Sequence, residues 1–341
     1  MYTGWTKPFK INRPLDGREC YAALPEHRQP GVTPDTYGGV IHFNSTYADF
    51  VDRKDRLRGM SVTTVWLLAS IFFLVFGAFF IGYFIWFDGY FVDRVSGFFA
   101  ISSTVFLSAI CIGSPWLFWH LHLRHDLFTY THYPIRFNRK TRKVYVFRHN
   151  GPGGVLIVPW DEVFWHIGRG LQQNFLCDIR GHVMEGVRVK DTFAVGQYFD
   201  DSRIDRILAT WEFIRRYMEE GPEAVAEHPL DRIIEKSVKP SWKNCYLWVG
   251  ASMGPGFVAL RYVLFPLFYP IVGLLTLGRW LTLNSCKEPV WPPEVEAECQ
   301  VEPNDPNRWE EPSYLWEFAN RPGVAERNEE RMRQQSDNLG R

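Results

Sequence analysis

Two long runs of apolar residues dominate the pattern of the chain. The first, VTTVWLLASIFFLVFGAFFIGYFIWF, extends from Val62 to Phe87, and the second, GFFAISSTVFLSAICIGSPWLFW, extends from Gly97 to Trp119. Each run is uncharged and long enough to cross about 30 Å of hydrocarbon, which takes a helix of about 20 residues. Because only DGYFVDRVS separates them, they predict an antiparallel transmembrane hairpin over residues 61–120. A soluble buried pair is disfavoured, since such helices are rarely uncharged on every face.

Small residues and basic flanks refine this prediction. Five small residues are expected to let the two helices approach closely; they are Ser61, Gly77, Gly82, Ser96 and Gly113. The connecting loop holds Arg94 beside Asp88 and Asp93, whereas the outer flanks are rich in Lys and Arg, which favour the cytoplasmic side. We therefore expect a multi-pass protein of the bacterial inner membrane, with its N-terminus and main domain cytoplasmic. The flanking basic residues are Arg53, Lys54, Arg56, Arg58, Arg124, Arg136, Arg139, Lys140, Arg142 and Lys143.

After the hairpin the apolar pattern changes to a period of two residues. The segment IRFNRKTRKVYVFRH predicts two strands around a turn at 138–142, and VLIVPWDEVFWHIGR, FLCDIRG and VMEGVRVKDTFAVG predict further strands. A helix follows in SRIDRILATWEFIRRYMEEG, where Ser202 and Asp205 have capping-box spacing. Trp160 and Trp211 are expected in the core. The predicted fold class is an α+β membrane protein, in which the transmembrane helical hairpin precedes a pleckstrin-homology-like antiparallel β domain with a capping helix over residues 121–222.

Several phrases of the sequence resemble a known family. The hairpin followed by PIRFNRKTRKVYVFR and VPWDEVFW is similar to bacterial membrane-anchored proteins with pleckstrin-homology-like domains. The phrases VPWDEV, WEFIRRYMEEGPE and WPPEVEAEC resemble an uncharacterised proteobacterial membrane family, a domain of unknown function often associated with type VI secretion loci. The resemblance covers about Val62 to Glu302 and implies a setting in toxin secretion. It brings no active residues to this chain.

The remaining segments are less regular. Residues 1–60 are expected to be an irregular cytoplasmic region, and residues 303–341 a polar tail that aromatic residues such as Trp309 and Trp316 fasten to the body. Residues 223–302 contain a second apolar stretch, from Cys245 to Leu283, broken by Gly and Pro. We expect an interfacial or re-entrant region there, with a third span or a soluble core as alternatives.

Composition narrows the functional classes. The chain has 38 basic and 38 acidic residues, so its zero net charge does not indicate a nucleic-acid partner. The mean hydropathy is slightly negative, as expected of a mostly soluble chain with an anchor. Aromatic residues make up 16%, which suits a large core or the headgroup belts of a bilayer. The six cysteines have no regular spacing, which favours free thiols in a reducing cytosol.

The basic strand pair is the first candidate site. Its residues form either a solvated face or a surface that contacts anionic lipid headgroups, each basic residue contributing about 1 kcal/mol; they are Arg136, Arg139, Lys140, Arg142 and Lys143. The second candidate is a partner-binding loop on the opposite side, with Gln172, Gln173 and Asn174. An extended partner segment can also add to a free sheet edge.

We find no catalytic pattern in the sequence. His120, His122 and His125 follow the second apolar run, where interfacial anchoring is the better interpretation than a metal site. The GPGG segment from Gly151 to Gly154 opens no helix and indicates a hairpin turn rather than a phosphate site. We therefore expect neither enzymatic activity nor a cofactor or metal.

Three functions are compatible with these expectations. The first is a non-enzymatic inner-membrane protein linked to type VI secretion, which acts as an immunity or effector-accessory protein through its cytoplasmic domain. Its partners would be the lipid bilayer and a toxin, effector or secretion-system component, with self-association into a homo-oligomer as a further option. The alternatives are a lipid-recognising envelope protein unrelated to toxins and a membrane-active effector.

Overall fold

The computed structural model describes residues 9–27, 31–53, 55, 58–59, 61–86, 97–170, 176–226, 228–259, 263 and 265–339. The chain forms two compact units. The first, here called the β unit, comprises residues 1–56, 130–247 and 288–341. The second, the helical unit, comprises residues 57–129 and 248–287.

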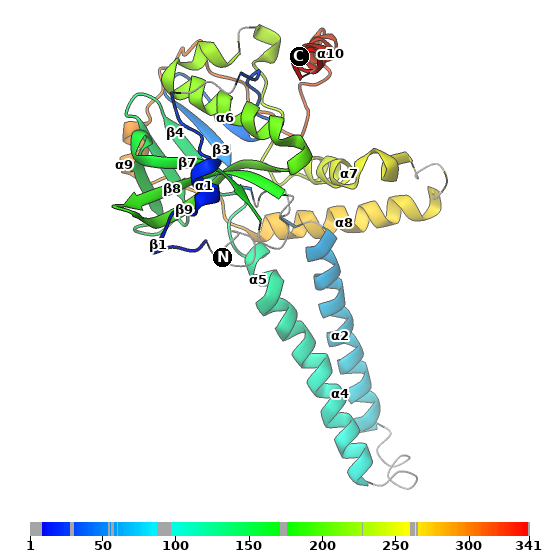
Figure 1. Cartoon of the computed structure of the whole chain (residues 1–341). Coiled ribbons are helices and arrows are strands. Elements are labelled where there is room, and N and C mark those ends of the chain that lie inside the picture. The colour runs from blue at the N-terminus through cyan, green and yellow to red at the C-terminus, as the bar shows by residue number, and fades with distance from the viewer. Residues whose placement is uncertain are drawn as a thin grey trace. The chain divides into compact units, whose positions relative to one another are not determined.

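The β unit contains two antiparallel sheets (Figure 1). The five-stranded sheet has the order β2 (Val40–Phe43), β3 (Tyr47–Val51), β4 (Pro134–Asn138), β5 (Lys143–Phe147) and β6 (Val155–Pro159). The four-stranded sheet has the order β1 (Arg13–Pro14), β9 (Arg188–Asp200), β8 (Leu176–Glu185) and β7 (Val163–Arg169). The strand pair predicted around residues 138–142 is therefore confirmed as β4 and β5.

One core joins both sheets to helix α6 (Ile204–Glu219). Trp160 and Trp211 are both fully buried, as expected, with their ring centroids 5.7 Å apart. Trp165 of β7 lies beside both rings, with its centroid 5.1 Å from that of Trp160 and 5.5 Å from that of Trp211, and Phe137 of β4 completes the cluster. The large aromatic content of the chain thus has a structural use in this core.

The N-terminal region differs from the expectation of irregular structure over residues 1–60. Strands β2 and β3 form a hairpin there, and β3 pairs with β4 from Tyr47↔Asn138 to Val51↔Pro134. The Asn44 side chain fixes the turn, because its Oδ1 accepts hydrogen bonds from the backbone N–H groups of Thr46 and Tyr47. A short helix, α1 (Gly17–Tyr21), precedes this hairpin.

The start of α6 also differs from the predicted capping box. A 3₁₀ turn, η4 (Asp201–Arg203), precedes the helix, and the Asp200 carboxylate accepts a hydrogen bond from the backbone N–H of Ser202. The cap therefore lies two residues before Ser202. The helix ends before Gly221, whose φ of 108° is open to glycine but strained for other residues.

The C-terminal part of the chain packs onto the β unit. Residues 288–302, expected in an apolar interfacial region, contain α9 (Pro293–Glu298). Val295 of this helix and Cys299, which follows it, pack on the buried Tyr145 of β5. Trp309 stacks on Phe43 of β2 with centroids 4.1 Å apart. Trp309, Leu315 and Phe318 are buried, whereas Trp316 is exposed. The chain continues as α10 (Val324–Leu339).

The helical unit contains the predicted apolar hairpin as two antiparallel helices, α2 (Ser61–Trp86) and α4 (Gly97–Phe118). A π-helical turn, η2 (Trp119–Leu123), and α5 (Arg124–Asp126) extend α4. Among the described residues, three segments are long and apolar enough to cross a membrane, namely Val62–Phe80, Thr104–Asp126 and Phe265–Ser285. The last of these is α8, whose Phe268 and Val272 pack on Val249 of α7 (Trp242–Ala259).

Close approach within this unit depends on particular glycines. A Cβ added at Gly77 would lie 2.6 Å from Cys111 Cβ, so α2 and α4 touch there. Gly82 and Gly113 have no such neighbour within 4 Å among the residues that the structure describes, so no close approach of the kind predicted is seen at them. Gly278 of α8 meets Thr64 of α2 in the same way, since its added Cβ would lie 2.1 Å from Thr64 Oγ1.

We predict that Gly77→Ala weakens the α2–α4 pair, because the new methyl group overlaps Cys111 and forces the helices apart. The expected result is a lower midpoint of thermal unfolding in detergent, followed by circular dichroism. Gly113→Ala is the matched control, because its side chain meets open space and alanine favours a helix by up to about 1 kcal/mol. Equal midpoints for the two variants would mean that the close contact at Gly77 does not stabilise the hairpin.

Candidate functional site

Arg136, the first of the predicted lipid contacts, is buried in the β unit. Its Nε and one terminal nitrogen donate to the two oxygens of Asp49, both at 2.8 Å. Its guanidinium carbon lies 3.8 Å from the centre of the Tyr47 ring and 4.7 Å from that of Trp291. Only 3% of Arg136 is exposed. The expectation that it faces headgroups is thus corrected, because the side chain is held between an acid and two aromatic rings.

The other basic residues of the strand pair face acidic residues of the same chain. Arg142 donates to Asp161 and Glu219, at 2.5 and 2.9 Å. Lys143 Nζ donates to Glu298 at 2.7 Å, and Lys140 lies 3.8 Å from Glu302. Arg139 is half-buried and, among the described residues, has no ion-pair partner. The positive charge of this strand pair is therefore largely compensated within the β unit.

The Asp49–Arg136 pair belongs to a longer chain of charges. His42 Nδ1 lies 3.2 Å from Asp49 Oδ2, and its Nε2 lies 3.5 Å from Glu311. Burial raises the pKa of Asp49, but Arg136 and His42 outweigh burial and lower this pKa to about 2. Burial opposes protonation of His42, whereas Asp49 and Glu311 raise its pKa to about 10. Asp49 and His42 are thus both charged at neutral pH.

The predicted partner loop of Gln172, Gln173 and Asn174 lies outside the described residues. His122, from the histidine-rich segment, contacts Thr63 Oγ1 at 3.1 Å through Nε2, and Thr63 in turn donates to Asp126. This contact joins the ends of α2 and η2 and brings no second histidine of that segment into reach. It gives no reason to revise the anchoring interpretation of the segment.

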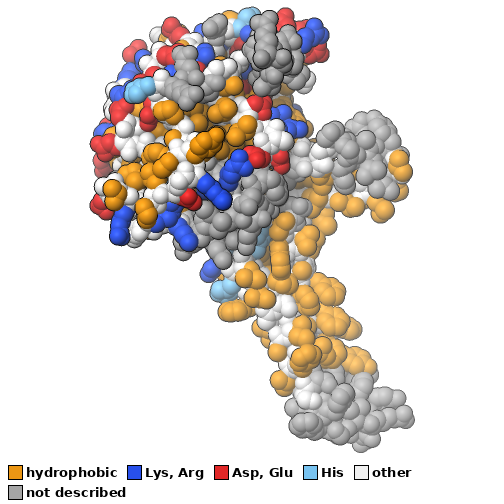
Figure 2. Space-filling model, viewed as in Figure 1, with side chains coloured by type: hydrophobic (Ala, Val, Ile, Leu, Met, Phe, Trp, Pro, Cys, Tyr) orange, Lys and Arg blue, Asp and Glu red, His pale blue; other side chains and the backbone are white. Residues whose placement is uncertain are grey.

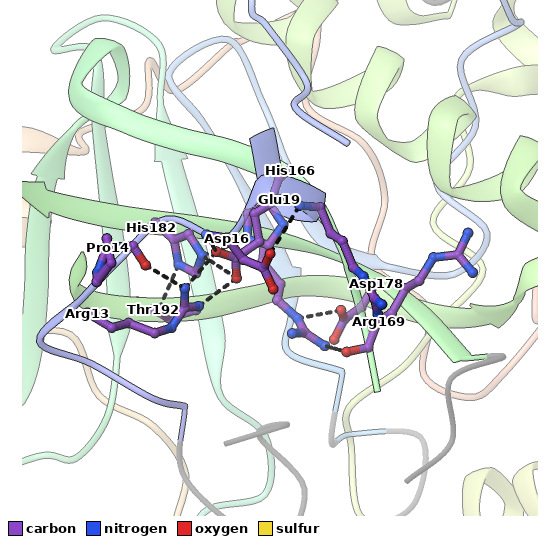
Figure 3. Close-up of polar contacts among 11 residues, drawn as sticks. Arg13, Pro14, Asp16, Glu19, His166, Arg169, Asp178, His182 and Thr192 are labelled. Carbon is purple, nitrogen blue, oxygen red and sulfur yellow. Dashed lines mark hydrogen bonds and ion pairs between the residues drawn. The ribbon is translucent and has the colours of Figure 1, made fainter. Parts of the chain in front are cut away.

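A different cluster, which sequence reasoning missed, lies within the β unit (Figure 3). Glu19 of α1, His166 of β7 and His182 of β8 are all buried. The two Nε2 atoms are 2.8 Å apart, and His182 Nε2 is 3.3 Å from Glu19 Oε1. One ligand-type atom from each residue thus lies within 4.8 Å of the others. We call these three residues the Glu–His–His cluster.

The local fold brings Glu19 to the two histidines. Asp16 and Glu19 form a capping box at the start of α1, in which Asp16 N–H donates to Glu19 Oε2 at 2.9 Å. The chain then runs beside β7, where Leu24 N–H donates to Trp165 O and Ile167 N–H donates to Ala22 O. Arg13 of β1 donates to both oxygens of Glu19, at 2.7 and 2.5 Å.

The surroundings of the cluster are polar and charged. His182 Nδ1 lies 2.7 Å from Thr192 Oγ1, and Arg180 donates to Asp178 at 2.7 Å. Burial lowers the pKa of His166 to about 3, assisted by the nearby His182 and Arg180. Burial raises the pKa of Glu19, but its hydrogen bonds with His182 and Arg13 have the opposite and larger effect. The pKa of Glu19 is therefore lowered overall. The cluster can hold a shared proton or a cation.

Spacing along the sequence gives no signal for this cluster. Glu19 is 163 positions from His182, and it approaches the histidines because the N-terminal arm folds back onto β7. The two histidines lie on neighbouring strands, with Phe164 opposite His182 and His166 opposite Arg180. Alternation within strands suggests which residues share a face of a sheet, but does not tell which strands are neighbours.

The chain matches a known protein family. A family model described as "Family of unknown function (DUF6708)" matches residues 115–303. This range includes Arg136, His166 and His182 and begins after Asp49 and Glu19. No curated protein and no solved structure matches the chain.

We predict that Asp49→Asn destabilises the protein by about 3–5 kcal/mol, because Arg136 then stays buried without its counter-charge. The measurement is urea unfolding of the purified chain in detergent. Asp161→Asn is the matched control: it removes the exposed partner of Arg142 and should cost at most about 1 kcal/mol.

The pH dependence gives a second readout for the same variant. The folded pKa of Asp49 lies below its ordinary value of about 3.9, so the ion pair stabilises the native state fully above that pH. The stabilisation is lost as the pH falls through about 2. The stability difference between wild type and Asp49→Asn should therefore shrink over this window, and a constant difference would contradict the assignment.

Proposed function

We propose a function for this chain, which belongs to the DUF6708 family of unknown function: it is a membrane-anchored, non-enzymatic binding protein. In this proposal α2 and α4 hold the chain in the bacterial inner membrane. The β unit remains in the cytoplasm and binds a protein partner. The exposed apolar surface of the hairpin is the observation that carries the anchoring.

Figure 2 shows apolar side chains along the outside of α2 and α4. More than half of each of the following side chains is exposed: Val65, Phe72, Val75, Phe79, Val105, Phe106, Ile112 and Trp116. Soluble monomers rarely expose contiguous apolar patches larger than a few hundred Å². Lipid hydrocarbon is the environment that accepts such a surface without a further protein.

The order of elements supports a pleckstrin-homology-like layout for the β unit. The consecutive strands β3 to β6 form one antiparallel set, β7 to β9 form a second, and α6 follows them against the shared core. Strands β1 and β2 would be additions at the edges of this plan. In this proposal the module binds its partner through its sheet edges and loops.

Strand β6 is the best-supported edge for a partner. The outer edge of β2 receives a backbone hydrogen bond from Trp309, and β7 is flanked by residues 22–24. Within the described residues, no segment forms backbone hydrogen bonds along the outer edge of β6, and its Ile157 side chain is 49% exposed. An extended segment of a partner protein can add there as a further strand.

The resemblance noted in the sequence suggests type VI secretion as the setting, with an effector or secretion component as the partner. An immunity or effector-accessory role would follow. The lipid-recognising alternative is weakened by the ion pairs of Arg136, Lys140, Arg142 and Lys143, which reduce the positive charge free for headgroups. A membrane-active effector remains the third candidate, but nothing in the β unit favours it.

We predict that a cysteine at Gly89, in the loop between the helices, reacts with an impermeant thiol reagent in intact spheroplasts. The charge bias of the flanks puts this loop outside. A cysteine at Val187, an exposed residue of the β unit, should react only after the inner membrane is permeabilised. Both are tested in a chain with Cys20→Ser, because Cys20 is exposed. If only Val187→Cys is labelled in intact spheroplasts, the orientation of the chain is the opposite of the predicted one.

We also predict that Ile157→Glu abolishes co-purification with the effector encoded in the same locus, because a charge on the edge strand opposes addition of another strand. The unfolding midpoint should change little, since Ile157 is exposed. Val187→Glu is the control, an equally drastic change at the turn between β8 and β9. Unchanged co-purification of Ile157→Glu would exclude the β6 edge as the binding site.

A further inference from the structure

We propose that the Glu–His–His cluster is a binding site for a divalent first-row transition metal ion, with Zn²⁺ as the ion to be tested. The ligands would be Glu19 Oε1, His166 Nε2 and His182 Nε2 (Figure 3). Two histidines and one carboxylate are a donor set that proteins use for zinc and for iron(II).

One of the separations between the ligand atoms matches a small tetrahedral ion, and a second is close to it. Zinc binds imidazole nitrogen at about 2.0–2.1 Å and carboxylate oxygen at about 2.0–2.2 Å, which puts two ligands of a tetrahedral site about 3.3 Å apart. Glu19 Oε1 and His182 Nε2 are at 3.3 Å. The two histidine nitrogens are at 2.8 Å, so the rings must separate by about 0.5 Å to reach that tetrahedral spacing.

The contacts of His182 are compatible with two states of the cluster. His182 Nε2 faces both His166 Nε2 and Glu19 Oε1. Without a metal, Thr192 Oγ1 donates to His182 Nδ1, and Nε2–H of the same ring donates to Glu19. In the metal-bound state the proton is on Nδ1, which donates to Thr192 Oγ1. The Nε2 lone pair then binds the ion together with His166 Nε2 and Glu19 Oε1.

The residues behind the ligands are arranged as supporting groups. Thr192 Oγ1 engages the second nitrogen of the His182 ring, and this type of contact fixes the ring orientation of metal-binding histidines. Arg13 and the backbone N–H of Asp16 hold Glu19. Ligating carboxylates are commonly held in this way.

A bound ion would join three separate parts of the β unit. Glu19 belongs to the N-terminal arm, whereas His166 and His182 belong to adjacent strands of the four-stranded sheet. Because the ligands meet only in the folded chain, binding would stabilise the folded state by mass action. Positive charge from Arg13 and Arg180 opposes a cation, so we expect weaker binding than at a cysteine-rich structural site.

The experiment uses the tag-free full-length chain in detergent, first stripped with a chelator and then titrated with Zn²⁺ against a chromophoric competitor. We expect one equivalent to bind with an apparent dissociation constant of about 1 µM or lower near neutral pH. Co²⁺ in place of Zn²⁺ should give the visible absorption bands of a tetrahedral site. X-ray absorption of the zinc form should show two imidazole ligands.

Variants separate this site from surface binding. Glu19→Gln keeps the shape of the side chain but removes its charge, and it should weaken zinc binding by about 100-fold or more, because a neutral amide is a poor zinc ligand. Thr192→Val, which removes the support of His182, should weaken it about 10- to 100-fold. His149→Ala removes an exposed histidine elsewhere in the β unit and should leave the affinity unchanged.

Three results would overturn the proposal: no stoichiometric zinc in the wild type, undiminished affinity in Glu19→Gln, or loss of affinity in His149→Ala. If Glu19→Gln does not fold, Thr192→Val and the spectra of the wild type still decide. Absence of the cobalt bands and of two imidazole ligands would then refute the site.

Discussion

A buried ion pair between Asp49 of β3 and Arg136 of β4 constrains the arrangement of the β unit. The two residues are directly opposite in the register of the sheet, so the pair bridges the strands that lie before and after the apolar hairpin. Tyr47 and Trp291 enclose the guanidinium, and Glu296 of α9 lies 3.4 Å from it. A charge pair in such a place is costly unless both members are well bonded. The C-terminal segment supplies part of that bonding, and so its position is tied to that of the sheet.

This pair also explains why the sequence predicted a lipid-facing surface at the basic strand pair, whereas the structure shows Arg136 buried beside Asp49. Positive residues close to an apolar run usually report membrane topology, and nothing local distinguishes Arg136 from Lys140. The acidic partners come from distant parts of the chain: Asp49 is 87 positions away from Arg136, and Glu298 is 155 positions away from Lys143. Local patterns therefore identify the charge but not its compensation.

Elements that depend on one segment of sequence could be predicted, whereas those that depend on long-range pairing could not. The hairpin, the β4–β5 pair and α6 follow from periodicity within a single segment, and Trp160 and Trp211 follow from their places in it. Strands β2 and β3 were missed because they are short and their pairing partner β4 follows the whole hairpin. The Glu–His–His cluster was missed because three elements with no shared pattern create it. Long-range pairing of this kind is not encoded in any one window of sequence.

The insertion of apolar segments into the β unit restricts how many times the chain can cross a bilayer. Strands β3 and β4 pair although α2 and α4 separate them, so an odd number of crossings between them would leave the sheet divided between two compartments. Residues 296–300 pack on β4 and β5, and the same argument applies to the segment 248–287. Helix α8 is apolar enough to cross, but a crossing by α8 alone would separate α9 from its sheet. In a membrane, the parity of any crossings would thus be set by the pairing of β3 with β4 and by the packing of residues 296–300, and not by the apolar helices themselves.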